Sequence, residues 1–133
     1  MLWHSNIYML VGIAGYDFSG YAIYMERKAI IVEGKSDKKR LCELLNEEVD
    51  IYCTFGTSDD ERLENLLDPD FYDKIYILTD ADQAGNRLRA RLREYYPQAR
   101  HIFTLRMYRE VATTPLPELA RQMNRYFQLT IDN

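Results

Sequence analysis

The sequence predicts a small three-layer α/β domain, in which helices cover both faces of a mainly parallel sheet of four to five strands. Short apolar runs alternate along the chain with amphipathic stretches of about ten residues, which is the order of βαβ units. The run at 74–79 (KIYILT) shows no polar alternation, as expected for a strand covered on both faces. The length of 133 residues matches one domain with one hydrophobic core.

Four apolar runs are predicted as strands. They lie at 29–33, 51–55, 74–79 and 101–105, each followed by turn or polar residues. After the first strand we expect a helix over 37–45, with Ser36 as its N-cap. After the second strand, Ser58 and Glu61 have the spacing of a capping box, which predicts a helix through residue 67.

The second half of the chain predicts two more helices. The longer one covers about 84–96 and ends before Pro97, because proline cannot continue a helix. The last helix is expected over 118–126, after the break at 113–117, and a short fifth strand over 127–131.

Residues 1–24 differ from the rest of the chain, because they are rich in aromatic residues, nearly uncharged and without helical or strand periodicity. We interpret them as an N-terminal extension, or as the product of a start codon assigned too far upstream, and expect the compact domain to cover 25–133. The alternative is an extra edge strand that packs on the core.

The charge is divided unevenly. The net charge of −4 argues against a protein that coats nucleic acid by charge alone. The segment 28–82 carries 15 acidic and 7 basic residues, whereas 83–133 carries 4 acidic and 9 basic ones. The acidic part could hold a cation and the basic part could face phosphates; the alternative is that these are ordinary solvated helix faces.

The compartment is predicted from what the sequence lacks. Cys42 and Cys53 form no CxxC pattern, which excludes a zinc ribbon or a thioredoxin-type site, so both are interpreted as reduced packing residues of a cytoplasmic protein. No apolar run reaches the roughly 20 residues that a membrane span needs. A signal peptide is not expected, since His4 is the only possible positive charge before the short apolar run at 7–15.

Acidic residues follow two of the predicted strands. Glu33 follows the first strand, and Asp80 and Asp82 follow the third. The carboxyl ends of parallel strands face the ligand crevice, and neighbouring strands lie about 4.8 Å apart, so the three carboxylates should converge if these strands are adjacent. Such a cluster needs a hard cation or a shared proton, and Mg²⁺ fits best, with Mn²⁺ as a substitute.

The roles within this cluster can be separated. Asp80 and Asp82 supply two oxygen ligands from one turn, which leaves Glu33 to act as a general acid or base beside the metal. The alternative is that the acids only cap helix N-termini, where the helix dipole favours negative charge. We prefer that alternative for Asp37 and for the pair at 59–60.

The pattern IIVEGKSD, then a Gly56-Thr57 turn, then ILTDADQAG resembles the toprim domain of topoisomerases, bacterial primases, overcoming-lysogenization-defect nucleases and the ribonuclease that matures 5S ribosomal RNA. The likeness covers about 28–108 and is greatest to small stand-alone toprim proteins. It implies a Rossmann-like toprim fold, a general acid/base at Glu33 and a Mg²⁺-binding pair at Asp80 and Asp82. It also implies close backbone approach at three glycines, Gly34, Gly56 and Gly85.

Some toprim features are missing. Gln83 and the segment 106–110 stand where some members have a further acid, which does not favour a second metal. No tyrosine can be assigned as a strand-cleaving nucleophile, and the short chain leaves no room for primase zinc or helicase-binding domains. A complete topoisomerase or primase is therefore not expected.

Basic residues near the acidic turn are candidates for phosphate contact. The helix after that turn carries an alternating set of arginines, Arg87, Arg89, Arg91 and Arg93, beside a packed stripe of Leu88 and Leu92. Arg87 is the strongest phosphate candidate, followed by Lys35, and Thr57 is a further candidate contact. Arg106 and Arg109 receive less weight.

The sequence therefore predicts Mg²⁺-dependent cleavage of nucleic acid, with structured RNA as the expected substrate and partner. The main alternative is an accessory module that binds metal and nucleic acid without turnover. A haloacid-dehalogenase phosphatase has its Asp-x-Asp on the first core strand, and a receiver domain has its acidic pair after strand one, so neither fits. No glycine-rich nucleotide loop is present, and the oligomeric state is left open.

Overall fold

The computed structural model describes residues 13–16, 22–105 and 107–130, with side chains described from Met25 onward. Its central sheet has the strand order β4-β3-β5-β6, and every neighbouring pair is parallel. The strands are β3 (Lys28–Val32), β4 (Asp50–Cys53), β5 (Lys74–Leu78) and β6 (Arg100–Ile102). The four carboxyl ends therefore lie along one edge of the sheet.

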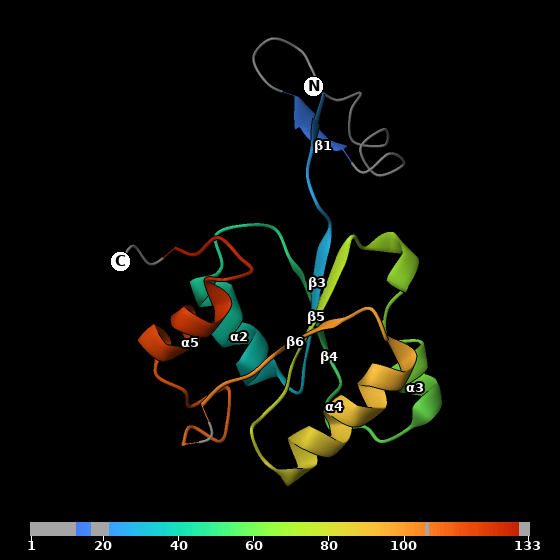
Figure 1. Cartoon of the computed structure of the whole chain (residues 1–133), viewed down its shortest axis with the longest axis vertical. Coiled ribbons are helices and arrows are strands. Elements are labelled where there is room, and N and C mark those ends of the chain that lie inside the picture. The colour runs from blue at the N-terminus through green and yellow to red at the C-terminus, as the bar shows by residue number, and fades with distance from the viewer. Residues whose placement is uncertain (1–12, 17–21, 106, 131–133) are drawn as a thin grey trace.

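Helices cover both faces of this sheet, as predicted (Figure 1). One face carries α2 (Lys35–Leu44) and α5 (Leu116–Met123), and the other carries α3 (Asp60–Glu64) and α4 (Gln83–Tyr95). A short 3₁₀ helix, η1 (Pro69–Phe71), precedes β5 and was not predicted. The three-layer α/β/α prediction is confirmed.

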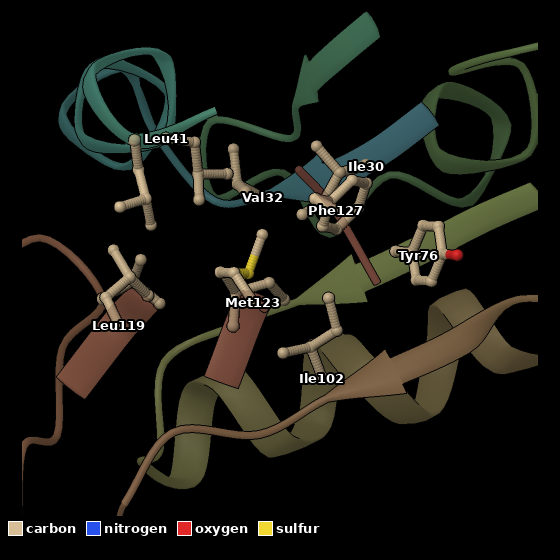
Figure 2. Close-up of a cluster of buried hydrophobic side chains, with 11 residues drawn as sticks. Ile30, Val32, Leu41, Tyr76, Ile102, Leu119, Met123 and Phe127 are labelled. Atoms are coloured by element: carbon tan, nitrogen blue, oxygen red, sulfur yellow. The ribbon is translucent and has the colours of Figure 1, made fainter. Parts of the chain in front are cut away.

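Two apolar clusters hold the layers together. Between the sheet and α2 and α5, side chains from β3, β5 and β6 meet Leu41, Leu119 and Met123 (Figure 2). On the other face, Leu88 and Leu92 of α4 and Leu63 of α3 pack on Ile31 and Ile77. Consecutive residues of β3 and β5 alternate between the two clusters, because strand side chains alternate between sheet faces. Both faces are thus apolar, which explains the unbroken apolar runs in the sequence.

The N-terminal segment contains strands that the sequence did not predict. β1 (Ile13–Tyr16) and β2 (Ala22–Tyr24) pair antiparallel with each other. In the described part of the chain they form a sheet separate from the four central strands. The remainder of the predicted extension lies outside the described residues.

The starts of α2 and α3 differ from the prediction, and at each an acidic side chain accepts a backbone amide of the first turn. α2 begins at Lys35 with Gly34 as N-cap, and the Asp37 carboxylate accepts the Gly34 amide at 2.9 Å, so Ser36 is inside the helix. Asp59 caps α3 by accepting the Glu61 amide at 3.0 Å, so the predicted capping box at Ser58 is wrong.

The C-terminal elements are shorter or shifted. α5 begins at Leu116, since Pro117 in its first turn loses no helical hydrogen bond. β6 ends at Ile102, and the predicted fifth strand is reduced to one bridge between Leu45 and Leu129 in the described residues.

Two further expectations concern the cysteines and the membrane. Cys42, predicted as a packing residue, is exposed. No helix within the described ranges has the length and apolar character needed to cross a membrane.

Candidate metal and catalytic site

The structure brings Glu33 and Asp80 together at the carboxyl edge of the sheet. Glu33 follows β3 and Asp80 follows β5, and these strands are hydrogen-bonded neighbours. The Asp80 backbone amide donates to Oε2 of Glu33 at 2.6 Å. The Glu33 carboxylate therefore reaches the start of the acidic turn, whereas the convergence of all three carboxylates stays a prediction.

The acidic turn between β5 and α4 is held by backbone hydrogen bonds. Oδ1 of Asp80 accepts the Val111 amide at 2.8 Å, and the Ala81 amide donates to the Arg109 carbonyl at 2.6 Å. Oδ1 of Asp82 accepts the Gly85 amide at 2.7 Å and so caps α4. The turn is thus fixed both by its own helix and by the segment that follows β6.

Each acid of the cluster keeps one oxygen without a protein donor. Oε1 of Glu33 and Oδ2 of Asp80 and Asp82 accept no hydrogen bond from the described residues, whereas the other oxygen of each is bonded to a backbone amide. Half-buried carboxylate oxygens without donors are the groups that a hard cation or water would satisfy. The arrangement fits oxygen-ligand chemistry.

The electrostatics of the cluster favour a proton or a cation. The pKa of Glu33 is raised to about 7, chiefly by burial, and further by the negative charges of Asp80, Asp82 and Asp37, although the Asp80 amide opposes the shift. Burial is also the main cause that raises the pKa of Asp37, a residue of α2 that is only 5 % exposed. Four carboxylates thus share one region of negative potential.

A divalent ion fits this donor set by its chemistry. Mg²⁺ usually takes one or two carboxylates and several waters, so the Asp-x-Asp turn is sufficient without a closed protein cage. Within the described ranges, no group of three or more His, Cys, Asp or Glu side chains is placed so that it could hold a metal ion, so the fit rests on the Asp-x-Asp pair alone. Asp80 and Asp82 are the residues that could hold the ion, with Glu33 beside them.

The three glycines singled out in the sequence have different surroundings. A Cβ on Gly85 would lie 2.1 Å from the Asp80 carbonyl oxygen, so only glycine fits beneath the acidic turn. Gly56 has a φ of 71°, which glycine adopts without strain. A Cβ on Gly34 would meet nothing closer than the Asp37 carboxylate at 3.8 Å, so the protein itself leaves room there.

The predicted phosphate contacts border the same edge. Lys35 is exposed at the start of α2, Arg87 is exposed on α4, and neither forms an ion pair with another described residue. Thr57 is half-buried, and its hydroxyl accepts the Asp59 amide at 3.2 Å. The two cations are therefore free to contact a ligand, while the threonine side chain is partly engaged.

The arginines of α4 do not form one basic wall. Arg89 is buried and bonded to strand carbonyls, and Arg91 pairs with Asp60. Arg87 and Arg93 are the exposed members of the set. The basic surface is smaller than the alternating pattern suggests.

Two features of the site were missed or given little weight from sequence. A cavity of about 510 Å³ adjoins the acidic turn, lined by Asp82, Met107, Tyr108, Arg109, Glu110 and Thr113. Phe55 and Phe103, just past β4 and β6, are 64 % and 58 % exposed. An aromatic residue directly before the Gly-Thr turn was the only sequence signal for Phe55.

Comparison with known proteins identifies the family. The Toprim domain family model matches residues 28–108. The uncharacterized protein YusF of Bacillus subtilis (strain 168) is 46% identical over 99 residues, which are 74% of this chain and 67% of YusF. Ribonuclease M5 of Mesoplasma florum is 35% identical over 72 residues, 53% of this chain but only 41% of that enzyme.

A solved structure agrees with the sequence match. The small TOPRIM domain protein from Bacillus stearothermophilus superposes with a TM-score of 0.72 at 46% identity, over 79% of this chain and 90% of that one. The family match covers the central strands and the acidic turn, including Glu33, Asp80 and Asp82. The chain belongs to the Toprim domain family.

Proposed function

We propose that this protein cleaves phosphodiester bonds of nucleic acid with the help of Mg²⁺, for which Mn²⁺ can substitute, and that its substrate is structured RNA. The observation that carries the proposal is the hydrogen bond from the Asp80 amide to the Glu33 carboxylate, which places a titratable acid against the Asp-x-Asp turn. The similarity to ribonuclease M5 supports RNA as the substrate, although the chain spans about two fifths of that enzyme.

The residues of the site would have different roles in this reaction. Asp80 and Asp82 hold the ion, which supplies charge neutralisation at the phosphate. Hydrolysis forms a bond from water oxygen to phosphorus and breaks the bond to the leaving oxygen. Glu33, whose carboxylate lies against the Asp-x-Asp turn, would take a proton from the water or give one to the leaving oxygen. Lys35 and Arg87 orient the phosphate backbone.

The test compares cleavage and binding in matched variants. Labelled structured RNA, single-stranded RNA and duplex DNA are incubated with Mg²⁺, Mn²⁺ or EDTA. We expect Glu33→Gln to lower cleavage about 100-fold or more with binding nearly unchanged. The double variant Asp80→Asn, Asp82→Asn should lose both metal binding, measured by calorimetry, and cleavage. Asp70→Asn, an exposed acid on η1, is the control and should behave as the wild type.

Two outcomes would contradict this proposal. Metal binding and nucleic-acid binding without any cleavage, together with indifference to Glu33→Gln, would indicate an accessory binding module instead. Metal binding that survives the Asp80 and Asp82 changes would place the ion elsewhere in the molecule.

A further inference from the structure

We propose that Phe55 and Phe103 are base-stacking residues, and that the acidic site acts on nucleic acid whose bases are unpaired beside the scissile phosphate. This inference rests on the proposed function and names its substrate class. It predicts that a loop or single-stranded segment, rather than continuous duplex, lies across the edge of the sheet.

Phe55 is held beside Glu33 in a backbone conformation that phenylalanine rarely adopts. Its φ is 54°, in the left-handed region where a Cβ is disfavoured. Its amide donates to the Glu33 carbonyl at 2.7 Å, so the residue is tied to the strand end that carries the candidate acid. Strained backbone of this kind persists where the surrounding structure enforces it, and it is concentrated at functional sites.

The folded protein gains little from the Phe55 ring. The side chain is 64 % exposed and belongs to neither apolar cluster of the sheet. A large apolar side chain on a strained, exposed position stabilises the fold less than a small polar one would. The ring is therefore available to a ligand at the site.

Phe103 provides a second ring beyond β6. It is 58 % exposed, with the Arg89 guanidinium 4.2 Å from its centroid and the His101 ring stacked at 6.4 Å. Arg89 is fixed by its bonds to strand carbonyls, so the phenylalanine rests on a rigid cationic support. A phenylalanine ring held in this way is suited to stack against the flat face of a nucleic-acid base.

The strand order places the backbone positions of the two phenylalanines on opposite sides of the strand ends that carry the acids. Phe55 follows β4, Glu33 follows β3, the Asp-x-Asp turn follows β5 and Phe103 follows β6. Three strand spacings separate β4 from β6, roughly 14 Å. A nucleotide strand that crosses this edge would pass one ring, then the acids, then the other ring.

Flat rings at this edge favour unpaired bases. In a duplex the base faces are covered by neighbouring base pairs and only base edges are accessible in the grooves. Stacking on aromatic side chains therefore requires splayed or single-stranded bases. A protein partner fits less well, because it would have to bury the carboxylates that follow β3 and β5, the strands between those that precede the two phenylalanines.

The experiment measures binding by fluorescence anisotropy in a Glu33→Gln background, so that cleavage does not interfere. The probes are a single-stranded RNA and the fully paired duplex of the same sequence, both with Mg²⁺. We expect Phe55→Leu combined with Phe103→Leu to weaken single-strand binding about tenfold or more, and duplex binding less than about twofold. Phe55→Tyr should retain binding because it keeps the ring. Met25→Ala, another exposed apolar residue, is the control.

A second measurement locates the contact directly. Ultraviolet cross-linking of a 5-iodouridine-containing single strand, followed by peptide mapping, should mark Phe55 or Phe103. Thermal unfolding of each variant establishes that the comparison is made between folded proteins.

The outcomes separate this inference from the proposed function. Equal loss for single strand and duplex, or no loss for either, would overturn the stacking inference while metal-dependent cleavage by the wild type still stood. A changed elution volume in size-exclusion chromatography without any effect on nucleic acid would indicate a protein interface instead. If the Glu33→Gln parent binds no nucleic acid at all, the proposed function fails and this inference fails with it.

Discussion

Arg89 joins a helix to two strands through one buried cation. Its guanidinium donates to the carbonyl oxygens of Ile77 at 3.3 Å and Ile102 at 2.8 Å, and it lies 3.0 Å from Nδ1 of His101. Burial lowers its pKa to about 10, so the group stays protonated at neutral pH. Since burial and the Arg89 charge both lower the pKa of His101, the imidazole accepts this contact in its neutral form. The cation thus ties α4 to β5 and β6.

Replacement of Arg89 by leucine should therefore destabilise the fold. The two carbonyl oxygens would lose charged donors in a buried place, and we expect the free energy of unfolding to fall by about 2–4 kcal/mol. Arg87→Leu on the same helix removes an exposed cation and should change it by less than about 0.5 kcal/mol. Urea unfolding followed by circular dichroism measures both. Equal effects of the two substitutions would show that the Arg89 bonds contribute nothing.

Strand-end residues were predictable individually, whereas buried cations and strained aromatics were not. Glu33 and Asp80 were placed correctly because their proximity depends only on which strands are neighbours. The alternation of arginines gives the helical face of Arg89 but not the strand carbonyls that receive it. Phe55 has a positive φ, and its amide donates to the Glu33 carbonyl at the end of the neighbouring strand. Such a contact between strands cannot be read from the spacing of residues in the sequence.

The turn from β5 into α4 is the element on which the site depends. Asp82 caps the helix, and Gly85 lies so close to the Asp80 carbonyl that no Cβ fits between them. The Asp82 side chain is oriented by its bond to the Gly85 amide, and the Asp80 side chain by its bond to the Val111 amide. The helix start was predictable to within one residue here, since both acids precede the amphipathic stretch.

The first residues of α2 and α3 depend on which nearby residue serves as the N-cap. At α3 the sequence offers both Ser58 and Asp59, and Asp59 is the N-cap that accepts the Glu61 amide. At α2 the N-cap is Gly34, whose amide donates to Asp37 inside the helix. Propensity alone ranks serine and aspartate as similar N-caps, so the choice could not be predicted. Gly34 and Gly85, the glycines next to the candidate acids, allow a test of how tightly the acidic turn is packed.

Gly85→Ala should disturb the acidic turn, whereas Gly34→Ala should not. The new Cβ would lie 2.1 Å from a backbone oxygen at position 85 but 3.8 Å from its nearest neighbour at position 34. We expect Gly85→Ala to lower the free energy of unfolding by about 1–3 kcal/mol and to weaken Mg²⁺ binding. Gly34→Ala leaves the turn undisturbed and should lower the free energy of unfolding by no more than about 1 kcal/mol, because alanine is a poorer N-cap than glycine. Thermal unfolding and calorimetry measure the two effects, and a neutral Gly85→Ala would mean that the turn can shift freely.

At the scale of the whole molecule, one sheet edge concentrates negative charge that the fold does not neutralise. The topology β4-β3-β5-β6 puts Glu33 and the acidic turn at the centre of the sheet, with Asp37 of α2 beside them. The sequence left the order of the strands open, since alternation of strands and helices predicts parallel pairing but not which strands are neighbours. Stability should therefore respond to any condition that charges or neutralises this edge.

The metal-free protein should lose stability as pH rises. Glu33 has its pKa raised from 4.5 to about 7 in the folded state, so between these values the unfolded chain releases the proton first and unfolding becomes easier. Asp37, whose pKa is also raised, acts in the same direction. From pH 5 to pH 8 in EDTA we expect Glu33 to cost on the order of 1–2 kcal/mol of unfolding free energy, after allowance for solvent screening.

The comparison of wild type with Glu33→Gln tests this contribution, because the variant removes the carboxyl whose pKa is raised to about 7 together with its repulsion of the neighbouring acids. Urea unfolding at pH 5 and pH 8 in EDTA should show the wild type falling further than the variant as pH rises. Mg²⁺ at pH 8 should recover stability, since an ion that binds the folded state shifts the equilibrium toward it. Asp80→Asn combined with Asp82→Asn should abolish that recovery. A wild type and a Glu33→Gln variant with the same pH dependence would show that the Glu33 carboxyl is not destabilised by this edge of the sheet.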